Sequence, residues 1–386
     1  MDIILLSTAD WDNPFWTNKQ HVALELSRLG HRVLYVDSLG LRRPTASARD
    51  LRRIGKRLMK AVRPPRKVRD NLWVWSPVVL PWQRYSVIRR INRLLLNAGL
   101  WLWMKALGLK RQWLWTYNPL TTAFFDLRSF DCCIYHCVDE IKAQPGMPVE
   151  ALEQAEEDLS RRVAIIFATS TQLAETRRVW NAHTYYLPNV ADFQHFNTAL
   201  DPRTVIPADL AAIPGPRMGF IGAISGYKVD LKLIRHLAES RPDWSIILIG
   251  EVGEGDPWTD ASLLHGLDNL HLLGPRAYED LPAYLKGFDA ALLPNLVNDY
   301  TDAMFPMKFF EYLAAGCPVV SVKLKALEEF TAVASVTSNP AEFTAAIEQV
   351  LGGNAPDLEQ RLSMARAHTY EARTLRMLAL IDGVCS

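Results

Sequence analysis

The first forty residues alternate short apolar runs with a helical period, and this alternation restricts the fold more than any other feature of the chain. Residues 3–6 form an apolar run, a polar loop follows, and apolar residues then recur at helical spacing over residues 22–29, before Gly30. A second apolar run occupies residues 32–37. Strand, helix and strand in this order connect parallel neighbours through a crossover helix. We therefore predict an α/β domain with a parallel sheet.

The same alternation continues along the 386 residues, a length that suffices for two or three cores of about 150 residues each. Further strands are expected at residues 113–117, 132–138, 164–169, 185–187, 217–222, 245–250, 270–274, 289–294 and 318–322. Prolines interrupt the pattern midway, as in an interdomain linker. We expect two doubly wound, Rossmann-like domains that face a cleft: residues 1–190 and 217–356, joined by a linker over 191–216, with a C-terminal helix over 357–386 that crosses back to the first domain.

Charge is unevenly distributed along the chain. The formal net charge is +1, from 43 basic and 42 acidic residues, but residues 42–125 contain 19 Lys or Arg against only Asp50 and Asp70. This segment therefore carries +17, and the remaining residues carry −16. It also holds seven of the 12 tryptophans. The segment thus favours a polyanionic partner that the net charge conceals.

Two parts of this basic segment have amphipathic helical patterns. In residues 42–69 and again in residues 84–111, Arg and Lys flank an apolar stripe with a period near 3.6. A basic amphipathic helix with tryptophan at its margins suits an anionic membrane surface, and we expect peripheral association with one. The alternative is a solvated basic face whose tryptophans lie in the core. Nucleic acid is not expected as a partner, because no recognised binding module accompanies the charge.

Three observations concern the compartment. The short run at residues 3–6 cannot supply the long apolar region of a targeting peptide. The longest charge-free apolar stretch, between Arg93 and Lys105, has 11 residues, against about 20 needed to span a bilayer. The five cysteines have neither metal-ligand spacing nor the density of a disulfide scaffold, so we expect all five to be unpaired and buried. We therefore predict a cytoplasmic protein on the inner face of the plasma membrane.

Residues 304–320 (MFPMKFFEYLAAGCPVV) carry the clearest chemical pattern. Pro306 fits the first position of a helix and Gly316 its end. A helix N-terminus favours an anion such as a diphosphate, and Lys308 adds a full positive charge. Glu311, three residues later, lies on the same helix face and can accept hydrogen bonds from the hydroxyls of a ribose. The pair predicts a nucleotide-sugar site, and the alternative is a surface ion pair.

This segment resembles the donor-site helix of GT-B glycosyltransferases, particularly family 4 and the related bacterial exopolysaccharide glucuronosyltransferases. Other stretches resemble further motifs of that family: residues 187–192 (LPNVAD) the end of its first domain, 220–226 (FIGAISG) with Asp230 its glycine turn, 248–250 (LIG) its second strand end, and 269–285 the segment whose loop holds the base. The resemblance implies the GT-B fold, an acceptor domain followed by a donor domain, and a nucleoside diphosphate sugar as donor. We expect this donor to be a UDP-sugar.

The resemblance also implies a donor site on the second domain. Its residues are Gly222, Ser225, Gly226, Lys228, Gly250, Tyr278, Met307, Lys308 and Glu311, with Tyr278 at the base, Lys308 at the diphosphate and Glu311 at the ribose. Retaining members of family 4 carry two glutamates eight positions apart, but the earlier position here is Ala303. This difference favours the inverting chemistry of the glucuronosyltransferase branch, in which a Met-Lys pair also precedes the ribose-binding position.

Inverting transfer needs a base on the first domain that takes a proton from the acceptor hydroxyl. Residues 135–140 (YHCVDE) end an apolar strand at a place where the resembling families have an acid. Asp139 is our first candidate for this base, and His136 and Glu140 are the alternatives. A cap of the following helix is the competing role of Asp139.

The first loop and the start of the helix after it, residues 10–21, are expected to line the acceptor side. Asp12 and His21 are further candidates for the base there, with helix capping or an ordinary surface position as their competing roles. No acidic triad or histidine pair has the spacing of metal ligands. GT-B enzymes stabilise the leaving diphosphate with helix ends and cations, so neither a metal nor a cofactor is expected.

The sequence therefore predicts a GT-B glycosyltransferase that moves a sugar from a UDP-sugar to a lipid-linked or polysaccharide acceptor at the membrane. Two other functions remain open. One is a sugar-nucleotide epimerase of the same architecture, which would need catalytic acids and histidines in the cleft. The other is a catalytically silent, membrane-associated protein that binds a sugar nucleotide, a reading that the missing glutamate at Ala303 favours.

Overall fold

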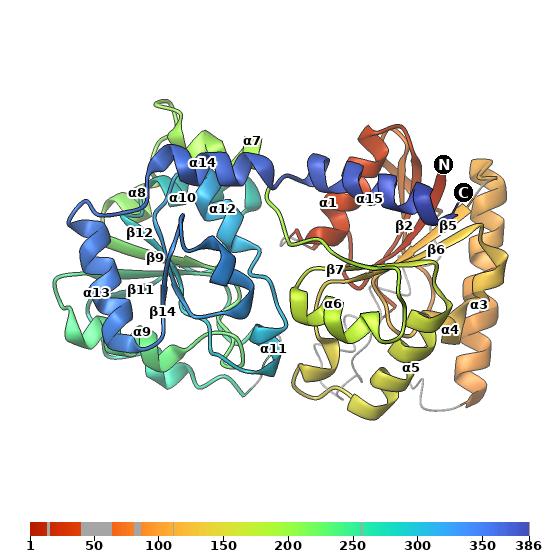
Figure 1. Cartoon of the computed structure of the whole chain (residues 1–386), viewed down its shortest axis with the longest axis horizontal. Coiled ribbons are helices and arrows are strands. Elements are labelled where there is room, and N and C mark those ends of the chain that lie inside the picture. Colours follow the sequence, from red (N-terminus) through yellow and green to blue (C-terminus); the bar gives the residue numbers. More distant parts are fainter. Residues whose placement is uncertain are drawn as a thin grey trace. The chain divides into compact units, whose positions relative to one another are not determined.

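The computed structural model describes residues 1–13, 16–39, 64–80, 86–110, 112–254, 256 and 258–385. The chain forms two compact units, each built on a mostly parallel sheet (Figure 1). Unit 1 contains Met1–Leu187 and Thr374–Ser386, and unit 2 contains Pro188–Arg373. The first amphipathic pattern of the basic segment lies largely outside the described residues.

Unit 1 has an eight-stranded sheet in the order β3-β4-β2-β1-β5-β6-β7-β8. Its strands are β1 (Asp2–Leu6), β2 (Arg32–Val36), β3 (Arg66–Arg69), β4 (Leu72–Trp75), β5 (Gln112–Thr116), β6 (Cys132–Cys137), β7 (Ile165–Ala168) and β8 (Thr184–Tyr186). Every neighbouring pair is parallel except β3 with β4. Strands β1, β6 and β7 are buried along their whole length, as expected of parallel strands that helices cover on both faces.

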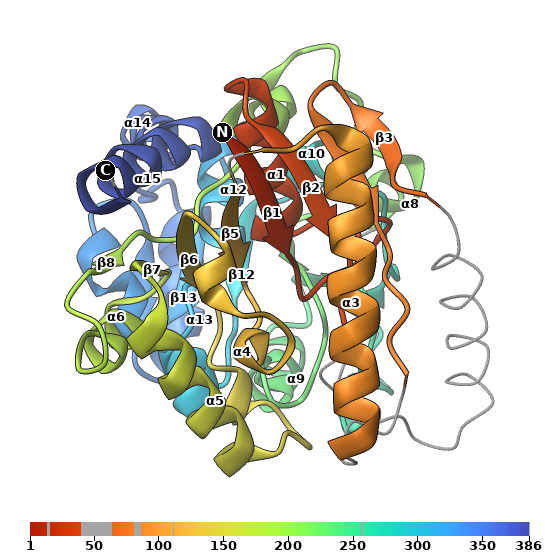
Figure 2. The ribbon, with the colours of Figure 1, turned by 90° about the vertical axis from the view of Figure 1, so that its right-hand side faces the viewer.

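The helices of unit 1 are α1 (Asn18–Arg28), α3 (Ser86–Leu107), α4 (Thr121–Phe124), α5 (Val149–Arg162), α6 (Thr171–Arg178) and most of α15 (Tyr370–Cys385). One core cluster joins Val22 and Leu26 of α1 to Met377 and Ile381 of α15 and to alternate residues of the strands. Figure 2 shows α3 as a long helix along one side of the sheet. A Cβ atom on Gly99 would lie 2.7 Å from the Trp75 ring, so this glycine lets α3 approach β4 closely.

Unit 2 has a six-stranded parallel sheet in the order β11-β10-β9-β12-β13-β14. Its strands are β9 (Arg217–Ile221), β10 (Ser245–Ile249), β11 (Leu270–Leu272), β12 (Ala290–Leu293), β13 (Val319–Val322) and β14 (Ser335–Thr337), and its helices are α7 (Phe193–Asn197), α8 (Ala208–Ala211), α9 (Leu231–Ser240), α10 (Leu281–Lys286), α11 (Asp299–Asp302), α12 (Lys308–Ala314), α13 (Pro340–Leu351) and α14 (Leu358–Ala367). In chain order the strands run 3-2-1-4-5-6, the order of a dinucleotide-binding fold. The doubly wound architecture predicted from the sequence is confirmed.

The segment expected to be a linker, residues 191–216, packs into unit 2 instead. Ala191, Phe196, Leu210 and Ile213 lie in the core cluster of that unit, which gives the segment a fixed position despite its prolines. Residues 357–373 also belong to unit 2, and only the remainder of α15 belongs to unit 1.

The basic segment differs from its predicted form in two ways. Residues 66–69, expected within an amphipathic helix, form strand β3 and pair with β4. Trp75, Trp113 and Trp115 are buried in strands of the sheet, while Trp101 on α3 is 61% exposed. The tryptophans therefore divide between the core and the surface, and the buried ones lie in strands, which aromatic residues suit.

The prediction of five unpaired cysteines is wrong for two of them. Cys132, at the start of β6, and Cys385, at the end of α15, form a disulfide across 253 residues of sequence. Cys133, Cys137 and Cys317 are buried free thiols, as expected. Spacing in the sequence could not reveal a pair that only the packing of α15 brings together. The cysteines therefore no longer support the predicted cytoplasmic location.

Candidate active site

In unit 2, the carboxyl ends of β9, β10 and β11 are drawn together by backbone contacts. The Gly222 N–H donates to Ile249 O over 2.9 Å, and the Gly250 N–H donates to Gly274 O over 3.1 Å. Gly250 has a φ of +153°, and a Cβ atom there would lie 1.8 Å from Gly222 O. Only glycine fits this position, so the two strand ends carry the close backbone approach that phosphate-binding turns use.

The turn after β9 is braced from within unit 2. Ser225 is buried and its hydroxyl donates to Glu254 O, while the Gly226 N–H donates to the Thr259 hydroxyl over 3.0 Å. Asp230 then caps α9 by accepting two backbone N–H bonds. The polar groups of Ser225 and Gly226 thus hold the shape of the turn.

Lys228 is the cation of this turn. Its Nζ lies 5.1 Å from the ring centre of Tyr227 and 5.4 Å from that of Tyr300, within the range of cation–π attraction. Its carbonyl accepts a bond from the Leu296 N–H over 2.9 Å. The two rings and the fixed backbone hold the ammonium group in the turn that follows β9.

Helix α12 places a second cation beside a buried acid. Lys308 Nζ donates to Glu311 Oε2 over 2.6 Å, and the side chains are 25% and 5% exposed. The predicted pairing on one helix face is therefore present, but the acid is buried and the pair is not a solvated surface contact. Met307 precedes the helix as its N-cap.

The position of α12 is set by contacts with the same sheet end. The Ile221 N–H, at the end of β9, donates to the Tyr312 hydroxyl over 2.9 Å. Phe309 and Phe310 are fully buried in the core of unit 2. Because Tyr312 follows Glu311 directly, this bond fixes the backbone that carries the acid relative to the end of β9.

Tyr278 lies within electrostatic range of Glu311. Its ring stacks on His195 at 4.4 Å, and His195 Nε2 lies 2.9 Å from the Tyr278 carbonyl. Burial raises the pKa of Tyr278 far above its ordinary value, and the negative charge of Glu311 adds to the increase. Tyr278, predicted to contact the nucleotide base, and Glu311, predicted to contact the ribose, therefore influence each other electrostatically.

In unit 1, Lys19 on α1 lies close to Tyr117, which follows β5, and to Asp139, which follows β6. Lys19 Nζ lies 3.9 Å from Asp139 Oδ2 and 5.8 Å from the ring centre of Tyr117. The Lys19 side chain is 10% exposed and that of Asp139 29% exposed. Asp139 therefore stands at the carboxyl edge of the sheet, partly open to solvent, with a buried cation facing it.

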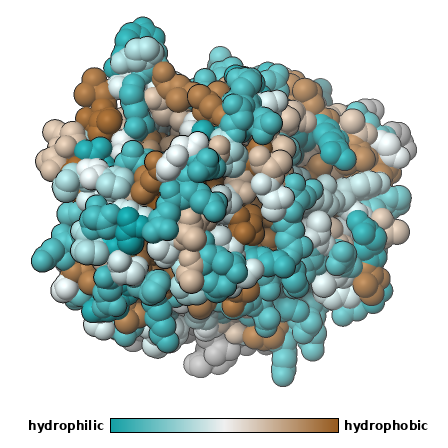
Figure 3. Space-filling view, turned by 60° about the vertical axis from the view of Figure 1, so that its left-hand side comes forward, coloured by the Kyte–Doolittle hydropathy of each residue, from teal (hydrophilic) through white to brown (hydrophobic). Residues whose placement is uncertain are grey.

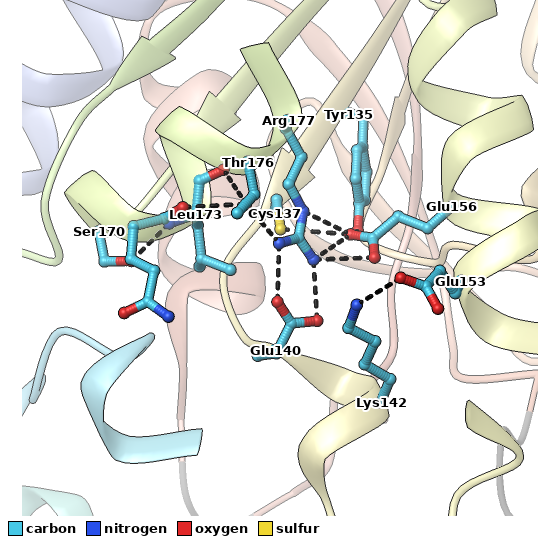
Figure 4. A network of polar contacts seen from close by, with 11 residues as sticks. Tyr135, Cys137, Glu140, Lys142, Glu153, Glu156, Ser170, Leu173, Thr176 and Arg177 are labelled. Carbon is cyan, nitrogen blue, oxygen red and sulfur yellow. Dashed lines mark hydrogen bonds and ion pairs between the residues drawn. The ribbon is translucent and has the colours of Figure 1, made fainter. Parts of the chain in front are cut away.

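The other candidates for the base have different surroundings. His136 is fully buried and stacks on Tyr117 at 4.8 Å, so it belongs to the core. Asp12 is exposed and pairs with Arg66 of β3. His21 is 6% exposed and meets the Trp16 ring edge-on at 5.3 Å. Glu140 accepts two bonds from Arg177 (Figure 4). Each of these four candidates is therefore either buried or held in an ion pair.

Sequence reasoning missed Lys19 as the partner of Asp139, and it missed Arg177 and Glu156 altogether. Lys19 was expected only as part of the acceptor-lining loop. The position of Lys19 on the inner face of an amphipathic helix could have indicated an acidic partner, since a lysine is rarely buried without one. Among the described residues, no group of three or more His, Cys, Asp or Glu is arranged to hold a metal ion.

Comparison with known proteins identifies a matching family model and a similar chain. Residues 215–352 match the family model of Glycosyl transferases group 1. A similar chain is TuaH of Bacillus subtilis (strain 168), whose name describes a glycosyltransferase of teichuronic acid biosynthesis. It is 29% identical over 279 residues, which cover 67% of this chain and 68% of TuaH.

Solved structures share the fold across nearly the whole chain. Sucrose-phosphate synthase from Thermosynechococcus elongatus superposes with a TM-score of 0.70 at 15% identity, covering 99% of this chain and 98% of its own. Anabaena HepE in complex with UDP and glucose gives 0.69 at 14% identity, covering 99% and 100%.

The two parallel-sheet units define the GT-B fold. With the family match over residues 215–352, the TuaH relative and the similar solved structures, they make this chain a glycosyltransferase of GT-B fold.

Proposed function

We propose that this glycosyltransferase transfers a sugar from a UDP-sugar to a lipid-linked or polysaccharide acceptor, with inversion at the anomeric carbon and without a metal ion. The observation that carries the donor assignment is the Lys308–Glu311 pair on α12, the helix whose Tyr312 hydroxyl bonds to Ile221 directly before the glycine turn, within residues that match a group 1 family model. The HepE structures contain UDP or UDP-glucose, which supports UDP as the nucleotide. The name of TuaH supports a polysaccharide product.

In the proposed reaction, the acceptor oxygen attacks the anomeric carbon while the bond to the diphosphate breaks. Asp139 takes the proton of the acceptor hydroxyl, and the leaving UDP carries away the electron pair of the broken bond. Lys308 and Lys228 offset the charge that develops on the diphosphate. Glu311 accepts hydrogen bonds from the ribose hydroxyls.

The enzymatic proposal is tested with the purified full chain, a panel of UDP- and GDP-sugars, and a bacterial membrane lipid extract. We expect one UDP-sugar to release UDP in the presence of the extract and to give a product of inverted anomeric configuration by NMR, unaffected by EDTA. A retained configuration would refute inversion. Conversion of the sugar nucleotide without the extract would indicate an epimerase, and binding without UDP release a silent protein.

The membrane part of the proposal rests on helix α3, which has two apolar faces. One face, including Leu96 and Leu100, packs against unit 1. The opposite face carries exposed apolar side chains at helical spacing i, i+4, i+7, i+8, i+14 and i+15. They are Val87 (61% exposed), Ile91 (37%), Leu94 (70%), Leu95 (43%), Trp101 (61%) and Leu102 (49%).

Such an outward apolar stripe needs a partner, because contiguous apolar surface on a monomer marks an interaction site. Arg89, Arg90, Arg93 and Lys105 are exposed on the same helix. Their charge favours an anionic lipid surface, by about 1 kcal/mol for each cation near it. On the face drawn in Figure 3, by contrast, hydrophobic residues occur in small groups among hydrophilic ones. None of the helices in the described parts of the chain is long and apolar enough to cross a bilayer.

A flotation assay tests the membrane proposal. The full chain is expected to float with vesicles containing anionic lipid and to remain in solution with neutral vesicles. Trp101→Ser should reduce flotation several-fold, because it removes the largest exposed side chain of the stripe. The matched control is Trp258→Ser, which removes a 72% exposed tryptophan from unit 2 and should leave flotation unchanged. Equal flotation with anionic and neutral vesicles would refute the proposal.

A further inference from the structure

Unit 1 contains a buried network of ionised side chains that no step of the proposed reaction uses. Figure 4 shows the Arg177 guanidinium between two carboxylates, with Tyr135 and Cys137 of β6 beside it. The Arg177 side chain, on α6, is 2% exposed. It donates to Glu156 Oε1 from Nε and Nη2 over 3.1 and 2.8 Å, and the Tyr135 hydroxyl donates to the same oxygen over 2.7 Å.

Glu140 is the outer member of this network. Arg177 Nη1 and Nη2 donate to its two carboxylate oxygens over 2.7 and 2.9 Å, and the side chain is 12% exposed. A paired, planar contact of this kind fixes both the distance and the orientation of the carboxylate. The turn after β6 is thereby tied to α6 directly and, through Glu156, to α5.

The residue before Glu140 is Asp139, so the network fixes the backbone that carries the proposed base. The two adjacent acids have different cations as partners: Lys19 faces Asp139 at 3.9 Å, and Arg177 holds Glu140. Without Arg177, Glu140 would be a second carboxylate free to turn toward the same edge of the sheet. Because Glu140 is paired with Arg177, Asp139 is left as the acid at the carboxyl edge of the unit 1 sheet.

Stability alone is a poor explanation for such a network. Replacing a buried ion pair by apolar residues of similar size is often neutral or stabilising, because burial removes the charges from water. The same α5 and the same turn are also joined by a second, more exposed ion pair, Lys142 with Glu153 at 2.9 Å.

We infer that Arg177 acts, through Glu140, as a positioning residue for the transfer step: it fixes the turn that holds Asp139 and removes Glu140 from competition as the base. The inference rests on the proposed role of Asp139. A general base must lie within hydrogen-bond reach of the proton it takes, and a displacement of about 1 Å can cost up to about 10²-fold in rate.

The test compares four variants of the full chain: Glu140→Gln, Arg177→Lys, Asp139→Asn and, as the matched control, Glu153→Gln. Each is assayed with the UDP-sugar found in the donor panel and a bacterial membrane lipid extract. Rates are expressed per mole of protein with native near-ultraviolet circular dichroism, well below the melting temperature. Glu140→Gln should lower kcat about tenfold and leave the donor KM within about twofold. Arg177→Lys should do the same, since lysine keeps the charge but cannot hold both carboxylates.

Glu153→Gln should keep kcat and KM within about twofold, because it breaks an exposed ion pair on the same elements without touching Glu140. If Glu140→Gln and Arg177→Lys lose no more kcat than Glu153→Gln while Asp139→Asn is nearly inactive, the inference is overturned and the proposed base stands. A donor KM that rises together with the loss of kcat would also overturn it. Normal turnover by Asp139→Asn would overturn the proposed base and the inference with it.

Discussion

An Asp139→Asn enzyme is expected to lose about 10² to 10⁴-fold in kcat and to bind UDP as tightly as the wild type. Asparagine has the size of aspartate but cannot take a proton, and a general base contributes a factor of this order. Asp139 stands at the open edge of the unit 1 sheet with Lys19 facing it, whereas UDP binding is assigned to unit 2. The measurements are steady-state kcat with the lipid extract and the UDP dissociation constant by calorimetry.

The control for this variant is Asp126→Asn. Asp126 also lies in unit 1, and its exposed pairing with Arg128 lowers the pKa of its carboxyl, but it precedes the amino end of β6, whereas Asp139 follows the carboxyl end. Its substitution should leave kcat unchanged, since exposed pairs contribute little. If Asp139→Asn keeps normal turnover, the base lies elsewhere. His21, next to Trp16 at the start of α1, would then be the first residue to replace.

Those parts of the structure that depend on local periodicity were predictable from the sequence. The strands and the crossover helix of the first forty residues, the strand before the glycine turn and the pairing of Lys308 with Glu311 all involve neighbours a few residues apart. Hydrophobic periodicity and the residues that start and end helices are visible in the sequence over such short separations. The order of motifs then indicated the donor unit.

Contacts between distant residues were not predictable in the same way. Lys19 and Asp139 are separated by 120 positions, and Cys132 and Cys385 by 253, so no local pattern records either pair. Arg177 and Glu156 look like ordinary charges on amphipathic helices until α5 and α6 are packed on β6. The hairpin of β3 and β4 was missed because its basic residues fit a helical stripe equally well. Tertiary packing overrides such local patterns.

Replacing Lys308 by methionine is expected to weaken UDP binding about 10 to 100-fold. Methionine keeps the length and apolar stem of the side chain but removes the charge that we propose for the diphosphate, and a hydrogen bond to a charged group contributes about 1.5–3 kcal/mol. Uridine has no diphosphate, so its affinity should change far less than that of UDP. Calorimetric titration of the variant with UDP and then with uridine separates the two contributions.

The matched control is Lys323→Met, which removes an exposed lysine of unit 2 that pairs with Glu328 at 3.5 Å and should leave UDP binding unchanged. Lys308→Met also leaves Glu311 buried without its cation, and an unpaired buried charge can destabilise the unit. Glu311→Gln separates the effects, because an amide oxygen still accepts from Lys308. This second variant should weaken UDP more than 2′-deoxy-UDP, since its lost contact is to the ribose hydroxyls. Equal losses for UDP and uridine in Lys308→Met would show a damaged site and contradict a diphosphate role for this lysine.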